Sequence, residues 1–516
     1  MSTPTAPEYP DKIDGAVLKI AGVVVLGAIM SILDITVVNV ALPVFQTEFA
    51  TSPDEPVAYS TVAWTVTAYT LALATVIPLT GWAADRFGTK RLYLLAVALF
   101  TAGSALCAAA GSIEMLIFFR IIQGLGGGML MPLGMTIMTK AAGPDRMGRL
   151  MAILGIPMLL GPILGPILGG WLIENQSWHW IFLINVPIGI GAIAYAFWAL
   201  PNDSAAPSES LDLVGIALMS PGLALFLYGV STIPEAGTIL DAEVLLTMLA
   251  GVALIAAFVR HSFRPEHPLL DLRLFKNRNL TASTLTMFLF AAAFFGGLLL
   301  VPTYFQQVRG ESTLDAGLLV APQGLGAMLT MPIAGALADK FPVGRIVPFG
   351  LVTIIAGMFA MTQIDADTSY TYLIAVLFVL GLGMGGTMMP IMTSALKTLK
   401  HHEVARGSTL LNIVQQIASS VGVAIMAVVL TNNLKDSALA GPATATWKDP
   451  ALVDKLGGEA VVQQGLSQAA DAFAGAFMVA AILVTLTLIP AYFLPRKKDE
   501  SKLVDQGEAA PPVVMH

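Results

Sequence analysis

Gly81-Trp82-Ala83-Ala84-Asp85-Arg86-Phe87 follows the second apolar segment of the chain, and the related stretch Gly335-Ala336-Leu337-Ala338-Asp339-Lys340-Phe341 follows the tenth. A second pair, Gly126-Gly127-Gly128-Met129-Leu130-Met131-Pro132 and Met384-Gly385-Gly386-Thr387-Met388-Met389-Pro390, lies in the fourth and the twelfth segments. Both matches indicate two related halves of six segments, with two further segments between them. Repeated halves are typical of secondary transporters, whose substrate site lies between the halves near the membrane midplane.

The composition favours a membrane protein. Of the 516 residues, 56% are hydrophobic and only 12% are charged, whereas soluble domains carry roughly 45–50% apolar and about 25% charged residues. So few charges cannot cover the surface of a soluble protein of this length, so we expect lipid to be the main solvent.

A membrane-spanning helix needs about 20 mostly apolar residues. This criterion predicts fourteen spans, at 18–43, 58–80, 92–111, 114–139, 150–173, 180–200, 212–232, 242–260, 280–305, 315–337, 345–363, 371–396, 407–431 and 470–494. The expected fold is all-α and integral to the membrane. Its parts are an N-terminal tail (1–17), a six-helix bundle (18–200), two inserted helices with their linkers (201–279), a second six-helix bundle (280–495) and a C-terminal tail (496–516).

Charge predicts the orientation. With a cytoplasmic N-terminus, most of the 27 Lys and Arg residues fall in the segments on the inner side, as the positive-inside rule requires. Both termini are therefore expected in the cytoplasm of a multi-pass protein of the cell (inner) membrane. The N-terminus lacks a short apolar core followed by a small-residue cleavage site, so the first span is expected to be retained.

Five motifs, in order along the chain, resemble those of the major facilitator superfamily, specifically its fourteen-helix drug:proton antiporter branch. They are Leu33-Asp34-Ile35-Thr36-Val37-Val38-Asn39, the Gly81–Arg91 stretch, Arg120-Ile121-Ile122-Gln123-Gly124, Gly161-Pro162 to Gly169-Gly170, and Trp178-His179-Trp180 to Pro187. The resemblance covers nearly the whole chain. It implies export of small lipophilic or amphipathic compounds by alternating access, driven by the proton gradient without a cofactor.

Asp34 is the first candidate for proton coupling. A carboxylate near the middle of a span is costly in lipid and is usually functional. Arg120, six residues into the fourth span, reaches about the same depth from the same surface at about 1.5 Å per residue. We expect Arg120 to hold Asp34 ionised until substrate or a conformational change separates them. The alternatives are that Asp34 only bonds a neighbouring helix and that backbone carbonyls satisfy Arg120.

Two further motifs have both a functional and a structural interpretation. By resemblance, the loop after the second span acts as a gate between the halves; its residues are Gly81, Asp85, Arg86, Gly88, Lys90 and Arg91. Its basic residues could instead only fix topology. The fifth span carries the antiporter motif Gly161, Pro162, Gly165, Pro166, Gly169 and Gly170. Small residues four positions apart also simply allow close helix packing.

The substrate signals are weaker. Methionine-rich surfaces suit varied apolar ligands, and lipid-facing or core packing explains the same residues equally well. The tentative cavity set is Asn39, Gln123, Met129, Phe294 and Met388.

Other classes of protein fit less well. The chain contains no Gly-x-x-x-x-Gly-Lys-Ser/Thr loop for ATP and no basic run for nucleic acid. With Cys107 the single cysteine and all six histidines outside the spans, we expect neither a metal site nor an enzyme. A dedicated exporter of an endogenous lipid, siderophore or metabolite remains the alternative, and a channel is a weaker one.

We expect a functional monomer, and the outer loop at 432–469 could bind a periplasmic adaptor or be a solvated linker.

Overall fold

The computed structural model describes residues 14–50, 57, 59–142, 146–202, 211–236, 238–265, 268–397, 399–400, 403–447, 450 and 452–497. Most of the two expected tails, 1–17 and 496–516, therefore lies outside the described residues. The same holds for the side chains of Pro162 and Pro166, two residues of the fifth-span motif. The described part of the chain is helical throughout its regular elements.

The first half contains α1 (Gly15–Glu48), α2 (Tyr59–Phe87), α3 (Thr89–Ala108), α4 (Ile113–Ala142), α5 (Met147–Asn175), α6 (Trp180–Leu183) and α7 (Asn185–Ala199). Two helices follow, α8 (Leu213–Ala236) and α9 (Ala242–Ser262), and then the short 3-10 helix η1 (Leu272–Lys276). The second half contains α10 (Arg278–Gln307), α11 (Thr313–Lys340), α12 (Val343–Met361), α13 (Tyr370–Gly385), α14 (Met388–Lys397), α15 (Val404–Asp436), α16 (Ala440–Ala445), α17 (Leu452–Leu456) and α18 (Glu459–Ala491).

The expected membrane fold is confirmed. Across the described residues, thirteen helical segments are long and apolar enough to cross a membrane. The 29-residue α5 is a further long helix, and with it the number matches the fourteen spans expected. In lipid every backbone polar group needs an internal partner, which a helix supplies. Polar side chains start several of these helices: Asp14 accepts from the Val17 amide at 2.8 Å, and Asp241 accepts from the Glu243 amide at 2.9 Å.

Two expected spans are each divided into two helices. The sixth, 180–200, is α6 and α7, which meet at Ile184. The twelfth, 371–396, is α13 and α14, with a turn at Gly386 and Thr387. A proline follows each interruption within a few residues, and proline has no amide hydrogen for the carbonyl four residues earlier. Pro187 leaves the carbonyl of Leu183 unbonded within the helix, and Pro390 does the same for Gly386.

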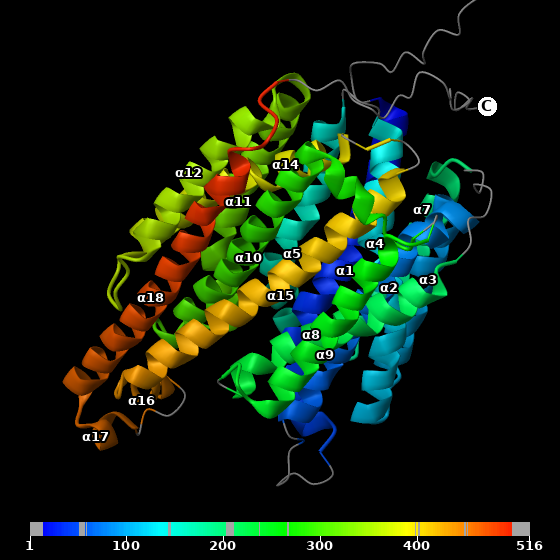
Figure 1. The fold of residues 1–516 in the computed structure, drawn as a ribbon. Coiled ribbons are helices and arrows are strands. Elements are labelled where there is room, and N and C mark those ends of the chain that lie inside the picture. Colours follow the sequence, from blue (N-terminus) through cyan, green and yellow to red (C-terminus); the bar gives the residue numbers. More distant parts are fainter. Residues whose placement is uncertain are drawn as a thin grey trace, which may run out of the picture.

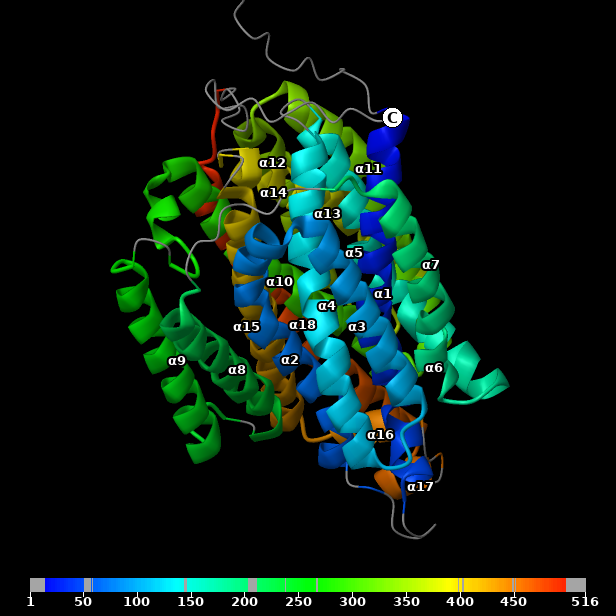
Figure 2. The same cartoon turned by 90° about the vertical axis from the view of Figure 1, so that its right-hand side faces the viewer.

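The helices pack as two groups with a flanking pair. In Figure 1, α11, α12 and α18 stand on one side of the molecule and α2, α3 and α7 on the other. The two groups meet where α5 packs on α11 and where α15 packs on α2 and α4. Figure 2 shows α8 and α9 along one flank, and α8 contacts both α2 and α15. The residue limits of the two bundles stay a prediction.

One end of the helices carries both termini of the described chain; we call it the Gly88 end. Lys140 at the end of α4 donates to Thr89 Oγ1 at 3.1 Å, and Arg146 lies 3.7 Å from Asp14 at the start of α1. At the same end the Gly344 amide donates to the carbonyl of Pro495 at 3.0 Å. The common end agrees with the even number of spans.

The segment between α15 and α18 is partly folded. The expected outer loop, 432–469, is shorter because α15 continues to Asp436 and α18 starts at Glu459. Between them α16 packs on α18, and the Trp447 indole donates to the carbonyl of Gln307 at 3.1 Å. The interpretation of this segment as only a solvated linker is therefore wrong, because its apolar side chains find partners on the second bundle.

Candidate functional site

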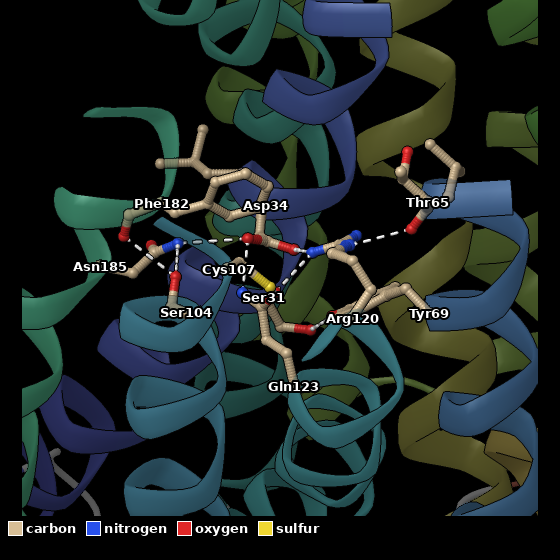
Figure 3. A network of polar contacts seen from close by, with 12 residues as sticks. Ser31, Asp34, Thr65, Tyr69, Ser104, Cys107, Arg120, Gln123, Phe182 and Asn185 are labelled. Atoms are coloured by element: carbon tan, nitrogen blue, oxygen red, sulfur yellow. Dashed lines mark hydrogen bonds and ion pairs between the residues drawn. The ribbon is translucent and has the colours of Figure 1, made fainter. Parts of the chain in front are cut away.

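Asp34 lies in the middle of α1 and is 2% exposed. Three side chains donate to its carboxylate (Figure 3). Arg120 from α4 forms an ion pair with Oδ2. Gln123 Nε2 donates to Oδ1 at 2.7 Å, and Asn185 Nδ2 from the start of α7 donates to the same oxygen at 3.2 Å. The expected pairing of Asp34 with Arg120 is present, and the surroundings fit an ionised carboxylate.

Arg120 is completely buried. Its Nε donates to the carbonyl of Thr65 at 3.0 Å, its Nη1 donates to Gln123 Oε1 at 2.7 Å, and its guanidinium lies 4.0 Å from the centre of the Tyr69 ring. Nη2 has no hydrogen-bond partner among the described residues. A buried donor without a partner costs about 1–3 kcal/mol, so Nη2 is the atom at which a bound acceptor or a rearranged network gains most.

A second group of side chains supports the first. Ser104 Oγ on α3 accepts from Asn185 at 3.1 Å and donates to the carbonyl of Phe182 at 3.0 Å. Cys107 lies 3.5 Å from Gln123 Oε1, and the hydroxyls of Ser31 and Tyr69 are 3.3 Å apart. We call Ser31, Asp34, Thr65, Tyr69, Ser104, Cys107, Arg120, Gln123 and Asn185 the Asp34 network. Its members come from five helices of the first half, and none comes from the second.

Charge balance determines what the Asp34 network can do. The buried carboxylate and guanidinium compensate one another, and removing one charge of a buried pair leaves the other uncompensated at high cost. The ion pair thus ties the position of Arg120 to the charge on Asp34.

The two halves contact one another at the Gly88 end through charged side chains. Arg406 Nε on α15 lies 3.9 Å from Asp85 Oδ2 on α2. Asp339 at the end of α11 is 5% exposed at its side chain and pairs with Arg149 at 3.1 Å and Lys397 at 3.2 Å. It also accepts from the Gly148 amide at 2.8 Å, at the N-terminus of α5, where the helix dipole favours negative charge.

The six residues expected to form a gating loop are almost entirely helical. Gly81, Asp85 and Arg86 lie in the last turns of α2, and Lys90 and Arg91 lie in the first turn of α3. Only Gly88 links the helices, with φ of 87°, a conformation that glycine adopts at little cost. The interpretation as a loop is wrong, because this one residue makes the whole turn.

The members of this motif have different surroundings. A Cβ on Gly81 would lie 3.0 Å from Thr409 Oγ1 of α15. Lys90 Nζ donates to the carbonyl of Leu200 within the first half at 2.7 Å. Arg86 and Arg91 are exposed. The structure thus brings Gly81 and Asp85 to the second half, but not Lys90, Arg86 or Arg91.

The fifth-span motif packs against α1 beside Asp34. A Cβ on Gly161 would meet Ile32, one on Gly165 would meet Thr36, and one on Gly169 would lie 3.1 Å from Val37 Cγ1. Thr36 Oγ1 also donates to the carbonyl of Gly161 at 3.2 Å. A Cβ on Gly170 would have nothing within 4 Å. Close helix packing therefore explains three of the four glycines.

The tentative cavity residues do not form one group. Gln123 belongs to the Asp34 network, and Asn39 is exposed. Met129, Phe294 and Met388 belong to one continuous buried apolar cluster, in which Phe294 stacks on Phe290 with ring centres 5.7 Å apart. Among the described residues, no group of three or more His, Cys, Asp or Glu side chains could hold a metal ion.

A family model described as Major Facilitator Superfamily matches residues 24–423. The chain belongs to this superfamily. Its members are transporters, and with the apolar helices described above the chain is a multi-pass protein of the cell (inner) membrane.

Curated members of the superfamily match over most of the chain. A protein named Multidrug resistance protein B homolog, from Mycobacterium tuberculosis, is 47% identical over 507 residues, which are 95% of this chain and 92% of the relative. A protein named Multidrug export protein EmrB, from Escherichia coli, is 30% identical over 423 residues, or 81% of each chain. The family resemblance inferred from the motifs is confirmed.

Solved structures of the superfamily share the fold. The human organic anion transporter MFSD10 gives a TM-score of 0.56 at 17% identity and covers 92% of this chain and all of its own. A double Trp mutant of XylE gives the same TM-score at 16% identity and covers 94% and 97%. At this identity the likeness concerns the fold alone.

Two parts of the site were missed from the sequence. Asn185 donates to Asp34 and to Ser104. The Gly148 amide and the Arg149 side chain donate to Asp339. Asn185 was noticed only as part of a motif. Its polar amide within an expected apolar span was the available signal, because polar groups inside the membrane are costly and need partners.

Proposed function

We propose that the chain exports small lipophilic or amphipathic compounds in exchange for protons, by alternating access. The observation that carries this proposal is the Asp34 network, which surrounds one buried carboxylate with three donors. The names of the relatives, one a multidrug resistance protein homolog and one a multidrug export protein, support export of several compounds. No cofactor and no catalysed reaction are needed, since the proton gradient supplies the energy.

Asp34 would carry the proton, and Arg120 would control when it binds. In the arrangement described, Arg120, Gln123 and Asn185 hold the carboxylate ionised. A rearrangement that moves Arg120 away leaves Asp34 buried without a counter-charge, which favours the neutral acid. Proton and substrate then occupy the protein in alternating states, because each requires a different arrangement of the same donors.

The contacts of Asp85 and Asp339 would close the Gly88 end. Charge distribution supports placing this end in the cytoplasm, and the arrangement would then be a state closed toward the cytoplasm. Of the residues at this end, we assign the gating role to Gly81, Asp85 and Asp339, because they contact the opposite half. Arg86 and Arg91 would help to fix the orientation.

A single chain would be sufficient for coupling, because every donor to Asp34 comes from the first half of the same chain. A periplasmic adaptor, if one is used, would bind at the exposed parts of the segment from α16 to α17. A chain that requires an adaptor would transport in cells and fail in proteoliposomes that contain only this protein, which separates the two cases.

The test is efflux of a lipophilic dye from proteoliposomes under an imposed proton gradient. Efflux in the native protein should follow the gradient and stop with an uncoupler, and Asp34→Asn should abolish it. Asp471→Asn is the matched control, because it makes the same change at an exposed acid in α18. Unchanged efflux in Asp34→Asn would place coupling elsewhere. Absence of efflux for every dye would favour a dedicated exporter of an endogenous lipid, siderophore or metabolite.

A further inference from the structure

A hollow of about 390 Å³ lies where α2 meets the flanking pair α8 and α9. This volume falls within the range of small-molecule sites, about 300–1,000 Å³. The hollow lies near the first turns of α2 and α9, at the opposite end of the helices from Gly88, and is separate from the Asp34 network. Its lining residues are Ala63, Trp64, Thr67, Tyr228, Ser231, Thr232, Ala236, Asp241, Glu243 and Val244.

Two aromatic rings from different parts of the chain stack beside the hollow. The centres of the Trp64 and Tyr228 rings are 5.6 Å apart, with an angle of 24° between their planes. Trp64 remains 40% exposed, so its indole is accessible to a ligand. Tyr228 donates its hydroxyl to Glu243 Oε1 at 2.7 Å, which fixes an acidic side chain of α9 next to the aromatic pair.

The charge of the hollow has one sign. Asp241 and Glu243 are acidic, and no Lys, Arg or His appears among the described lining residues. Asp241 Oδ1 caps α9 by accepting from the Glu243 amide at 2.9 Å. The Tyr228 hydroxyl donates to one carboxylate oxygen of Glu243. Hydroxyls of Thr67, Ser231 and Thr232 complete the polar part of the lining.

Aromatic belts at the ends of spans are common in membrane proteins, but a belt does not require acidic side chains around the rings. Ring faces attract cations through their quadrupole, and an adjacent carboxylate adds to this attraction. Apolar walls with a few placed polar groups are typical of small-molecule sites. Together these features select a positively charged ligand with an apolar body.

We propose that this hollow binds a lipophilic organic monocation, at a site distinct from Asp34. The shared chemistry is an ammonium or phosphonium group against Trp64 with Glu243 as counter-charge. Such a group occurs in soluble amphipathic cations, and an ammonium group also occurs in the zwitterionic headgroup of phosphatidylethanolamine. Because α8 and α9 supply Tyr228 and Glu243, the site gives the inserted helix pair a binding role besides its place beside the bundles.

The test measures binding of tetraphenylphosphonium to the full chain in nanodiscs of phosphatidylglycerol. Asp34→Asn serves as the background, so that exchange at Asp34 does not contribute. In this background Glu243→Gln and Trp64→Leu should each weaken binding about fivefold or more, and Trp64→Phe should restore part of the affinity. Glu174→Gln, at an exposed acid near the end of α5, is the matched control and should leave the affinity unchanged.

Two further arms identify the natural occupant. Phosphatidylethanolamine in the nanodiscs should compete with tetraphenylphosphonium if the headgroup is the ligand, and should leave binding unchanged if the ligand is a soluble cation. Equal affinity in Glu243→Gln, Trp64→Leu and their background would overturn the proposal. The same holds if a neutral aromatic probe of similar size binds as tightly as the cation. The binding assay with tetraphenylphosphonium needs no transport. Failure of the dye-efflux experiment would therefore count against the exchange mechanism and not against this binding site.

Discussion

Gly148 of α5 and Gly335 of α11 lie backbone to backbone across the two halves: a Cβ on Gly335 would be 2.5 Å from the carbonyl oxygen of Gly148. Next to them Asp339 accepts from the Gly148 amide at 2.8 Å. The close approach and the hydrogen bond depend on one another, because only glycine lets the start of α5 come near enough to Asp339. This contact joins the two halves at the Gly88 end on one side of the molecule.

Gly148→Ala should therefore favour the state in which the Gly88 end is open, since its Cβ would meet the carbonyl of Gly335. We expect slower dye efflux and a longer distance between spin labels on α3 and α12. Cys107, the single native cysteine, can be replaced first so that only introduced cysteines are labelled. Gly191→Ala in α7 is the control, because a Cβ there has nothing within 4 Å. An unchanged label distance in Gly148→Ala would contradict the prediction.

Asp339→Asn should impair efflux more than Asp85→Asn does. The Asp339 side chain is 5% exposed and 3.1–3.2 Å from two cationic groups, whereas that of Asp85 is 29% exposed and 3.9 Å from Arg406. Asp339 also accepts from the Gly148 amide at 2.8 Å, so its neutralisation weakens three contacts, and ion pairs closer to solvent contribute less. Parallel measurement of efflux and thermal unfolding tests the order. A larger loss in Asp85→Asn would reverse it.

Arg120→Leu should destabilise the protein by about 3–5 kcal/mol, because it leaves the Asp34 carboxylate buried without its counter-charge. The double variant Asp34→Leu/Arg120→Leu should recover part of this loss, since it removes both charges. Thermal unfolding of the two single variants and the double variant forms a complete cycle. Strictly additive effects would show that the two side chains are not coupled.

Asn185→Leu should reduce gradient-driven efflux about tenfold, because hydrogen bonds to charged groups contribute about 1.5–3 kcal/mol. The change removes the donor to Asp34 and also the donor to Ser104. Asn432→Leu makes the same change at an exposed position in α15 and should leave efflux unchanged. Proton release on addition of substrate provides a second measurement. A native value of both quantities in Asn185→Leu would remove Asn185 from the site.

Asp212, before the first residue of α8, should make stability depend on pH. Burial raises the pKa of its carboxyl, but hydrogen bonds from the Gly215 amide, His261 and the Leu269 amide outweigh burial and leave the pKa below its ordinary value. A lowered folded-state pKa stabilises the protein above the unfolded value, about 3.9, and this contribution is lost as pH falls toward the folded value. Asp212→Asn should thus lower the unfolding temperature at pH 7. The difference from the native protein should shrink below about pH 4; a constant difference down to pH 3 would exclude this linkage.

Much of the fold could be predicted from the sequence, because apolar length and repeated motifs are local properties of the chain. The pairing of Asp34 with Arg120 followed from their depths in neighbouring spans. Asn185 could not be selected in the same way, since only the packing of α7 against α1 and α3 brings it to Asp34. The role of Gly148 could not be predicted from the sequence either, because the group that donates to Asp339 is its backbone amide rather than a side chain.

The clearest difference between the sequence-based expectation and the structure lies in where the helices end around the motifs. A motif of charged and glycine residues between two spans was interpreted as a loop, but α2 and α3 continue through it to Gly88. The breaks in the sixth and twelfth spans could not be predicted from Pro187 and Pro390 alone. Whether a proline interrupts a membrane helix depends on its neighbours: α1 and α2 contain Pro43 and Pro78 and remain continuous.

The position of α8 makes the two halves mechanically unequal. Ser220 of α8 donates to the carbonyl of Thr75 in α2 at 2.7 Å. The apolar side chains of α8 share one cluster with residues of α2 and with Leu410 and Ile413 of α15. Hydrogen bonds resist sliding, whereas apolar contacts are non-directional and can be remade at a new register. When the halves move relative to one another, the inserted pair would therefore stay with the first half. The contact between α8 and α15 would be the one that slides.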